Sequence, residues 1–452
     1  MKILYILPEF PPGFGGGIAT VYGQLLSRLQ SSGCDITVLL VRQDCLDQVC
    51  YLWKGVSVVP LQSYYLQRAK DALIAWRNQS FLYNFLPFAW AAWEQASAMG
   101  HFDIVEVTDW ALLFLPWLVN ERTLPVVVSL HGSCGQVDWH GNPSCRHGEG
   151  QLVRLIEAAS LPLADGLIAN SITNSEFWRR QCGVVTQMIP PIFEPLSSSS
   201  KLRQLPQLDI KAAPVLQGVV VGRLQNWKGP ALLCEALRLA PMVQIDWIGQ
   251  DTSWEERGIS TASHLREKYP DIIDRQLHFV GPLPPSDVQR RILDASFLCI
   301  PSLWDVFNVT SLEAIMLGTP VICSTEAGAS MLFEDQISGY LFDPSLPSSL
   351  ADRLQIIKDS SGMTQQLMAK RAFSNLSKLT IDCAPIATYM QLYGDLVQSF
   401  STPKSSEWLA SLIAYHDDLP PNENSHSAAR AVKAIRKGCA KIFKKSEGLF
   451  KR

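Results

Sequence analysis

Residues 301–314 read PSLWDVFNVTSLEA, and two acids in this stretch, Asp305 and Glu313, lie on either side of a turn that opens an apolar helix. A strand is predicted over residues 297–300 and a helix over residues 309–317. The unpaired amides at the start of that helix face back into the loop, so an anion can bind there beside two carboxylates suited to hydroxyl groups. An ordinary buried strand, turn and helix with a solvated acid at each end would read the same way, so the rest of the chain must decide between the two interpretations.

Length and composition predict two packed domains. The chain has 452 residues, of which 47% are hydrophobic and 18% are charged, and single cores usually stop growing below this length. A net charge of −3 gives no global basic field, so we do not expect nucleic acid as a partner. The charge balance does not exclude small or neutral substrates.

The amino terminus and the apolar stretches predict a cytoplasmic protein. Residues 3–7 read as a first strand that Pro8 and Glu9 cut short, not as a signal peptide. The eleven Cys have no paired short spacing, so free thiols in a reducing compartment are expected. The apolar stretches 81–93 and 111–119 are too short or too interrupted for a membrane span.

The pattern of apolar runs predicts an α/β fold with two doubly wound domains that face each other across a cleft. Short Val-, Ile- and Leu-rich runs alternate with helical patterns over residues 1–205, which is typical of a parallel sheet covered on both faces. After a polar stretch that reads as a linker, the alternation restarts over residues 206–385. Open α/β sheets bind ligands at the carboxyl ends of their strands. Residues 386–415 are predicted to form a helix that packs back on the first domain.

Residues 416–452 differ in character from the rest of the chain. A polar segment leads into apolar residues at helical spacing, among them Ile442 and Phe443, set against a face of Lys and Arg. A solvated helix, a docking helix for a protein partner and an interfacial membrane helix all fit this pattern. The Lys-rich face suits anionic lipid, so the protein is expected to lie on the cytoplasmic face of a membrane if it binds one.

A glycine-rich loop, residues 11–17, follows the first predicted strand. Gly16 and Gly17 are candidate ligand contacts, because glycine allows the backbone to approach a ligand closely at a helix amino end. A flexible turn is the alternative. The loop is not the G-x-G-x-x-G fingerprint, and Val41 and Arg42 stand where a ribose-binding acid would be expected, which disfavours a nicotinamide enzyme.

Two cations lie in the loop that opens the second predicted domain. Arg223 and Lys228 follow the strand predicted over residues 217–221 and precede a helix. Both can reach one diphosphate, Arg through a forked pair of hydrogen bonds and Lys as a point charge. Two solvated surface residues are the alternative. The order of these cations before Asp305 and Glu313, all after strands of one domain, favours a shared ligand site.

Residues 1 to about 400 resemble the retaining glycosyltransferases of family 4, which have the two-domain GT-B fold. The motifs that carry the resemblance occur in the family's order along the chain, and this order is far more specific than any single motif. They are Gly16-Gly17, His131-Gly132, Ala169-Asn170-Ser171, the loop from Gly222-Arg223-Leu224 to Lys228-Gly229, and the Asp305 to Glu313 stretch.

The resemblance implies a binding site for the donor diphosphate on the second domain. Arg223 and Lys228 would hold the diphosphate. The backbone amides near Asn308, Val309 and Thr310 would assist them at the amino end of the helix.

The resemblance also implies sites for the sugar, the ribose and the acceptor. Glu313 would bind the ribose hydroxyls and Asp305 the hydroxyls of the donor sugar. His131 would lie near the reacting sugar as a hydrogen-bond partner, and Gly16 and Gly17 would line the cleft from the acceptor side. A His at a strand end often only satisfies backbone groups, which is the alternative for His131.

The chain departs from the family's pattern at several positions. Asp305 replaces the usual Glu and is one methylene shorter. Asn308 stands where glycine is common, a tolerable change because Asn can adopt left-handed backbone angles. Residues 190–194 replace the familiar domain-crossover turn, and residues 325–330 lack the usual double glycine and the Glu that follows it.

Cys134, His140, Cys145 and His147 cluster after His131 without regular zinc-site spacing. Residues placed in this way are usually loop or core residues. We therefore expect no metal.

Taken with the resemblance, the sequence predicts a hexosyltransferase that moves a sugar from a nucleotide-diphosphate sugar to a hydroxyl of a glycan or lipid-linked glycan. Catalysis would be electrostatic, retaining and metal-independent, with no cofactor beyond the donor substrate. No carboxylate stands out as a covalent nucleophile. A sugar-nucleotide epimerase or phosphorylase on the same fold, or a catalytically silent binding protein, are the alternatives.

Overall fold

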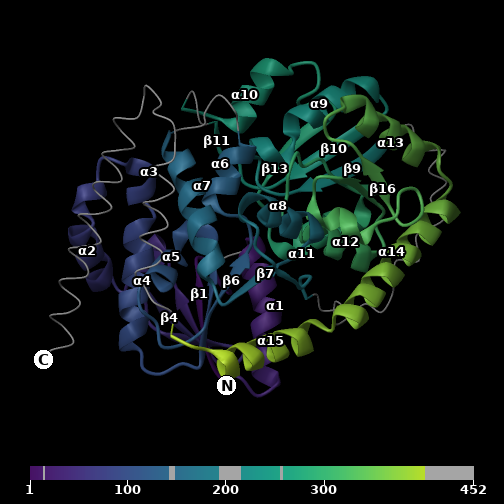
Figure 1. Ribbon diagram of the computed structural model, residues 1–452. Helices are drawn as coiled ribbons and strands as arrows, with labels where there is room; N and C mark the ends of the chain where they lie inside the picture. Colours follow the sequence, from purple (N-terminus) through teal and green to yellow (C-terminus); the bar gives the residue numbers. More distant parts are fainter. Residues whose placement is uncertain (14–15, 142–147, 193–214, 255–257, 403–452) are drawn as a thin grey trace, which may run out of the picture.

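A computed structural model describes residues 1–13, 16–141, 148–192, 215–254 and 258–402 of the chain. It contains two α/β domains, each with a parallel sheet between layers of helices (Figure 1). The predicted α/β fold class is confirmed. The predicted linker from Ser197 and the predicted basic helix lie outside the described residues.

The first domain has an eight-stranded sheet in the order β3-β4-β2-β1-β5-β6-β7-β8. All neighbouring strands are parallel except β3 and β4, an antiparallel pair at one edge. Neither β3 nor β4 was predicted, and of the two only β3 is short and half exposed. The strands are β1 (Lys2–Leu7), β2 (Asp35–Leu40), β3 (Tyr51–Trp53), β4 (Val56–Pro60), β5 (Ile104–Thr108), β6 (Val126–Leu130), β7 (Gly166–Ala169) and β8 (Gln187–Met188).

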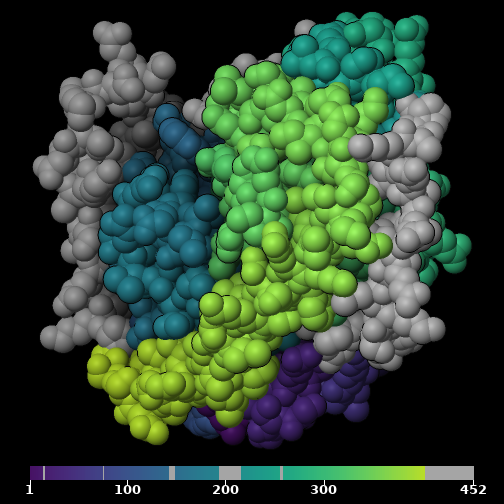
Figure 2. Space-filling model, turned by 90° about the vertical axis from the view of Figure 1, so that its right-hand side faces the viewer, coloured from purple at the N-terminus to yellow at the C-terminus, as the bar shows by residue number. Residues whose placement is uncertain are grey.

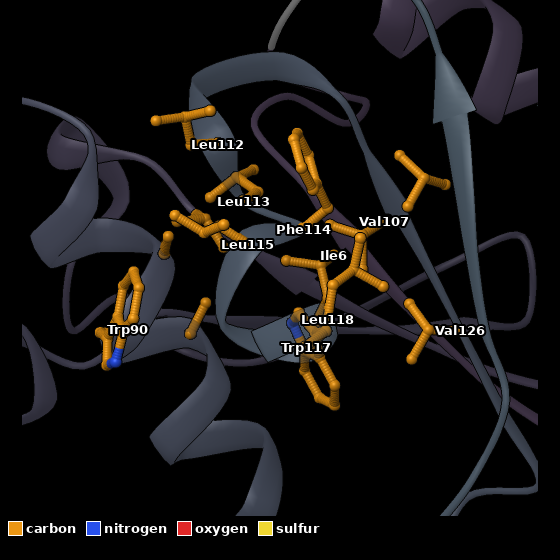
Figure 3. Close-up of a cluster of buried hydrophobic side chains, with 14 of the residues drawn as sticks. Ile6, Trp90, Val107, Leu112, Leu113, Phe114, Leu115, Trp117, Leu118 and Val126 are labelled. Carbon is orange, nitrogen blue, oxygen red and sulfur yellow. The ribbon is translucent and has the colours of Figure 1, made fainter. Parts of the chain in front are cut away.

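Helices bury their apolar faces on both sides of this sheet. On one side, Trp90, Val107 and Phe114 belong to one large cluster of buried apolar side chains (Figure 3). Burying a side chain of this size removes about 1.5–3 kcal/mol of unfavourable hydration. The helices are α1 (Gly17–Ser31), α2 (Ser63–Ala72), α3 (Ser80–Tyr83), α4 (Leu86–Ala98), α5 (Leu115–Val119), α6 (Cys134–His140), α7 (Gly148–Ser160) and α8 (Ile172–Cys182).

The second domain has a six-stranded parallel sheet in the order β13-β10-β9-β14-β15-β16. The order reverses between β9 and β14, which places a crevice at the carboxyl ends of these two strands. A separate hairpin joins β11 (Ser253–Trp254) to β12 (Ile259–Ser260). The sheet strands are β9 (Leu216–Val221), β10 (Val243–Ile248), β13 (Leu277–Gly281), β14 (Phe297–Ile300), β15 (Val321–Ser324) and β16 (Tyr340–Phe342).

The helices of the second domain follow its strands in the predicted alternation. The helix of the acidic stretch begins one residue later than expected, at Thr310, and ends at Leu317, where Gly318 adopts the left-handed conformation. The helices are α9 (Pro230–Leu239), α10 (Thr261–Lys268), α11 (Pro285–Asp294), α12 (Thr310–Leu317), α13 (Pro347–Asp359) and α14 (Gly362–Cys383), and α15 (Pro385–Ser399) follows them along the chain. None of the helices within the described ranges is long and apolar enough to cross a membrane.

The last described helix, α15, leaves the second domain and lies against the first. Figure 2 shows the yellow end of the chain running from the green second domain to the purple amino-terminal segment. Tyr389 and Tyr393 of α15 are buried in the core beneath β1, and the hydroxyl groups of Tyr393 and Tyr5 lie 2.9 Å apart. The first domain is therefore completed by a helix from the other end of the described chain.

Candidate active site

A cleft of about 810 Å³ separates the two domains, and all ten predicted site residues line it. The first domain contributes residues from the start of α1 and from the end of β6. The second domain contributes the loops after β9 and β14 and the first turn of α12. The ten residues are Gly16, Gly17, His131, Arg223, Lys228, Asp305, Asn308, Val309, Thr310 and Glu313.

Lys228 and Asp305 form an ion pair in the cleft. The Lys228 Nζ lies 2.6 Å from Asp305 Oδ2, and both side chains are largely buried, with 22% and 12% exposed. Asn308 Nδ2 donates to the same carboxylate oxygen at 3.0 Å. These partners fix the shorter carboxylate of Asp305 at the mouth of the loop, so neither Lys228 nor Asp305 is an ordinary solvated surface residue.

The loop that carries Lys228 depends on a glycine. Residues 226–228 form a single helical turn, and Gly229 ends it with φ +75°. A Cβ at Gly229 would collide with the carbonyl oxygen of Pro301, at the end of β14. Only glycine therefore allows the loop after β9 to approach the loop after β14 closely enough for the ion pair to form.

Arg223 lines the cleft next to this pair. Among the residues that the structure describes, its guanidinium has neither an ion-pair nor a hydrogen-bond partner. A guanidinium in this state can offer two parallel donors to a phosphate.

The amino end of α12 opens into the cleft without a side-chain cap. Asn308, just before the helix, has φ +72°, so the prediction that Asn tolerates the position where glycine is common is confirmed. Thr310 Oγ1 donates to Asn308 Oδ1 at 2.6 Å, which holds the turn in place. The amides of Ser311 and Leu312 donate to the carbonyl oxygens of Asn308 and Val309, whereas the amides of Val309 and Thr310 have no partner among the described residues. These two amides can therefore bind an anion.

Glu313 projects from the first turn of α12 into the same cleft. Burial raises the pKa of its carboxyl group from 4.5 to about 6. No hydrogen-bond donor from the described residues satisfies the carboxyl, so it can accept hydrogen bonds from a ligand's hydroxyl groups.

His131 follows β6 on the opposite wall. The carboxylate of Asp109 accepts hydrogen bonds from the backbone amides of His131, at 2.8 Å, and Gly132, at 3.2 Å. Burial lowers the pKa of the His131 ring to about 4, so the ring is neutral at pH 7. The ring lies against Tyr22, whose hydroxyl oxygen is 3.3 Å from His131 Nε2.

Sequence reasoning missed Asp109, Glu106 and Tyr22 behind this wall. Asp109 and Glu106 are fully buried, and burial raises the pKa of Asp109 to about 7. Glu106 lies among the apolar residues of strand β5, and an acid at such a position could have indicated a buried polar cluster. Tyr22 had no such indication, because its place on α1 fits an ordinary core position.

The two domains touch beside Asp305. Ser171 Oγ donates to the Val306 carbonyl oxygen at 2.6 Å, and the rings of His140 and Trp304 stack with centroids 4.5 Å apart. His140 therefore packs against the other domain, while Cys145 and His147 lie outside the described residues. Within the described ranges, no group of three His, Cys, Asp or Glu side chains is placed to hold a metal ion.

The fold and the site define a GT-B architecture, with two doubly wound domains whose loops face each other across a ligand cleft. The family model for glycosyl transferases group 1 matches residues 216–373, and the model for the glycosyl transferase 4-like domain matches residues 16–183. The chain belongs to the glycosyl transferases of group 1, with a glycosyl transferase 4-like first domain. The predicted resemblance is confirmed.

Curated relatives carry the same kind of name. The chain is 25% identical over 334 residues to the D-inositol 3-phosphate glycosyltransferase of Salinispora arenicola, covering 70% of this chain and 73% of the relative. It is 30% identical over 274 residues to that of Corynebacterium jeikeium, covering 56% of this chain and 62% of the relative. The second match thus spans less than two thirds of the relative's length.

Solved structures share the fold. The sucrose-phosphate synthase of Thermosynechococcus elongatus superposes with a TM-score of 0.68 at 19% identity, over 88% of this chain and all of the other. Anabaena HepE, solved with UDP-glucose, superposes with a TM-score of 0.57 at 20% identity, also over 88% of this chain and all of the other. At these identities the likeness supports the fold alone.

Proposed function

We propose that this glycosyltransferase moves a hexosyl group from a nucleotide-diphosphate sugar to a hydroxyl of a glycan or lipid-linked glycan, with retained anomeric configuration and without a metal. One observation carries the proposal. Arg223, the Lys228–Asp305 pair and the uncapped amino end of α12 meet on one wall of one cleft.

The roles on this wall follow from charge and reach. Arg223 and Lys228 bind the diphosphate with the amides at the start of α12, and a diphosphate draws Lys228 partly away from Asp305. Asp305 then keeps Asn308 as a donor and accepts from the hydroxyls of the donor sugar. Glu313 binds the ribose hydroxyls from the first turn of the helix.

The reaction needs stabilisation of negative charge more than it needs a base. The bond between the anomeric carbon and the diphosphate oxygen breaks, and its electron pair stays on the nucleotide diphosphate. The acceptor oxygen bonds to the anomeric carbon, and the acceptor proton leaves on the released diphosphate. Arg223, Lys228 and the helix amino end stabilise the charge that develops on the leaving group.

UDP-sugars and inositol phosphates are the first substrates to test. HepE was solved with UDP-glucose, and the curated relatives are named for D-inositol 3-phosphate. A donor panel of UDP-, GDP- and ADP-sugars, combined with inositol phosphates, glycans and lipid-linked glycans, covers the proposal.

Arginine and lysine variants test the diphosphate site. Arg223→Ala and Lys228→Ala should each weaken UDP binding about 10-fold to 100-fold, because a hydrogen bond to a charged group contributes about 1.5–3 kcal/mol. Arg180→Ala, which removes a cation that is 74% exposed on α8, is the matched control and should bind UDP normally. Binding by calorimetry that is unchanged in both cleft variants would overturn the assignment.

The finer parts of the proposal have separate tests. Proton NMR of the first product should show the donor's anomeric configuration, and an inverted product would contradict retention. Turnover should be unchanged by a chelator, and its loss, restored by a divalent cation, would contradict a metal-independent reaction.

The basic tail supports a location on an anionic membrane, argued from its sequence alone. Deleting residues 427–452 should abolish sedimentation with vesicles of anionic lipid and leave turnover of a soluble acceptor unchanged. Equal sedimentation of the shortened and full chains would remove this part of the proposal.

A further inference from the structure

A buried chain of hydrogen bonds connects His131 to the core of the first domain. Tyr22 of α1 and Glu106 of β5 are both fully buried. The Tyr22 hydroxyl donates to Glu106 Oε1 at 2.7 Å, and its oxygen lies 3.3 Å from His131 Nε2. The ring planes of Tyr22 and His131 are tilted by 56°, with centroids 5.1 Å apart.

Glu106 is surrounded by hydroxyl groups that donate to it. Ser129 of β6 donates to Oε1 at 2.7 Å, and Tyr393 of α15 donates to Oε2. Burial raises the pKa of Glu106, while the three hydroxyl donors act in the opposite direction. An ionised carboxylate can only accept hydrogen bonds, and three hydroxyl groups converge on this one.

The direction of these bonds determines what Tyr22 can offer to His131. A phenol has one hydrogen, and if that hydrogen points to Glu106, only oxygen lone pairs face the ring. His131 Nε2 must then carry a hydrogen to bond Tyr22. In a neutral imidazole the other nitrogen, Nδ1, is left with a lone pair.

We propose that Glu106, acting through Tyr22, holds His131 in the tautomer with hydrogen on Nε2, so that Nδ1 accepts a hydrogen bond from a hydroxyl of the bound sugar. Glu106 and Tyr22 are positioning residues, since neither lines the cleft, whereas His131 does. The inference rests on the proposed function for the identity of the hydroxyl. The tautomer itself does not depend on it.

The arrangement makes His131 selective for donors of hydrogen bonds. In the opposite tautomer, Nδ1–H would repel a hydroxyl hydrogen and would favour a carbonyl or phosphate oxygen. Because Nε2 faces the core, Nδ1 is the ring nitrogen left to address the cleft. The buried network thus determines that His131 presents a hydrogen-bond acceptor, and not a donor, to the cleft.

Nitrogen NMR of the full chain with labelled histidine reads the tautomer directly. The His131 signals are assigned by their loss in His131→Ala. We expect hydrogen on Nε2 and a bare Nδ1 in the wild type at pH 7. Hydrogen on Nδ1 in the wild type would overturn the proposal, whether or not any variant folds.

Tyr22→Phe keeps the ring and removes the hydroxyl that accepts from Nε2. It should produce a mixture of tautomers, whereas Tyr5→Phe should not, because the Tyr5 hydroxyl bonds to Tyr393 and not to Glu106 or His131. Tyr5 is the matched control, since it is equally buried and its ring packs against Tyr22. An unchanged tautomer in Tyr22→Phe would contradict the inference.

Kinetics add a readout that loss of stability alone would not move. Tyr22→Phe should lower kcat/KM about tenfold, as expected for the loss of one hydrogen bond. In the His131→Ala background it should cause no further loss, because the two residues act as one unit. An equal loss in both backgrounds would contradict the positioning role. If no donor is turned over, the proposed function fails, and the NMR result still decides the tautomer.

Discussion

The two walls of the cleft hold their polar groups in opposite ways. On the second domain, Arg223, Lys228 and Asp305 reach the cleft from loops and lie at its surface, paired with each other or unpaired. On the first domain, His131 is held by the buried Tyr22 hydroxyl and by the hydrogen bond from its backbone amide to Asp109. Burial lowers the pKa of the His131 ring to about 4 and raises the pKa of Asp109 to about 7. The second domain therefore supplies charge for a ligand, whereas the first supplies a fixed, neutral imidazole.

Asp305 gives the largest expected effect on activity. It tests the wall of the second domain formed by Arg223, Lys228 and Asp305, called here the charged wall. Asp305→Asn should lower kcat/KM about 100-fold or more, because it removes both the partner of Lys228 and an acceptor for sugar hydroxyls. Asp305→Glu keeps the carboxylate and adds one methylene, which gives the side chain that the family resemblance leads one to expect at this position. This variant should keep most of the activity. Steady-state kinetics with a saturating acceptor compare the two. If both variants lose activity equally, the position of the carboxylate matters as much as its charge, and the longer side chain does not replace Asp305.

Asp109 tests the wall of the first domain that carries His131, called here the fixed wall. A substitution there should change the free energy of unfolding before it changes ligand binding. Asp109→Asn keeps one acceptor oxygen for two backbone amides, so one amide loses its partner. The free energy of unfolding should fall by about 1–3 kcal/mol, with UDP affinity within about threefold of the wild type. Urea unfolding and calorimetry measure the two quantities. Weaker UDP binding without loss of stability would contradict the claim that Asp109 acts on the fold and not on the ligand.

Glu313 gives the smallest expected effect, and its partly buried carboxyl group belongs to the same wall as Arg223 and Lys228. Because burial raises the folded pKa from 4.5 to about 6, the native state binds this proton more tightly than the unfolded chain does. The stabilising contribution is full below pH 4.5 and is lost as the pH rises through 6. Glu313→Gln should therefore be more stable than the wild type by about 2 kcal/mol at pH 8 and no more stable at pH 4.

Urea unfolding at both pH values checks the prediction for Glu313. Asp352→Asn, which changes an exposed acid on α13, is the control and should show no such pH dependence. Calorimetry of donor binding should show that the affinity of the wild type rises between pH 5 and 7 as Glu313 ionises, and that rise should be absent in Glu313→Gln. A stability difference that does not change with pH would assign the effect to packing.

The ten predicted site residues are a part of the cleft lining, and most of them could be placed there because they lie in loops that follow strands. In a parallel sheet the carboxyl ends of the strands share one edge, so Arg223, Asp305 and His131 could be placed at the cleft from their positions alone. The ion pair between Lys228 and Asp305 could not be predicted, because it depends on the close approach of two loops at Gly229.

The buried network behind His131 was beyond sequence reasoning for a related reason. Its members come from α1, β5, β6 and α15, and no local pattern shows that Tyr393 meets Glu106. A Tyr at helical spacing reads as an ordinary core residue. The edge strand β3 was missed because three half-exposed residues give a weak periodic pattern, whereas β4 alternates buried and partly buried residues and could have been predicted.

The return of α15 to the first domain also affects how the chain is made. A ribosome releases residues 1–190 long before it releases Tyr389 and Tyr393, yet these two residues fill the core beneath β1 and one of them bonds to Glu106. Until then the nascent first domain lacks the Tyr393 hydroxyl that donates to Glu106, and the apolar surface that α15 covers is exposed. Cutting the chain after residue 384 should therefore leave a first domain that aggregates during synthesis, and a peptide of residues 385–402 supplied in trans is expected to rescue it.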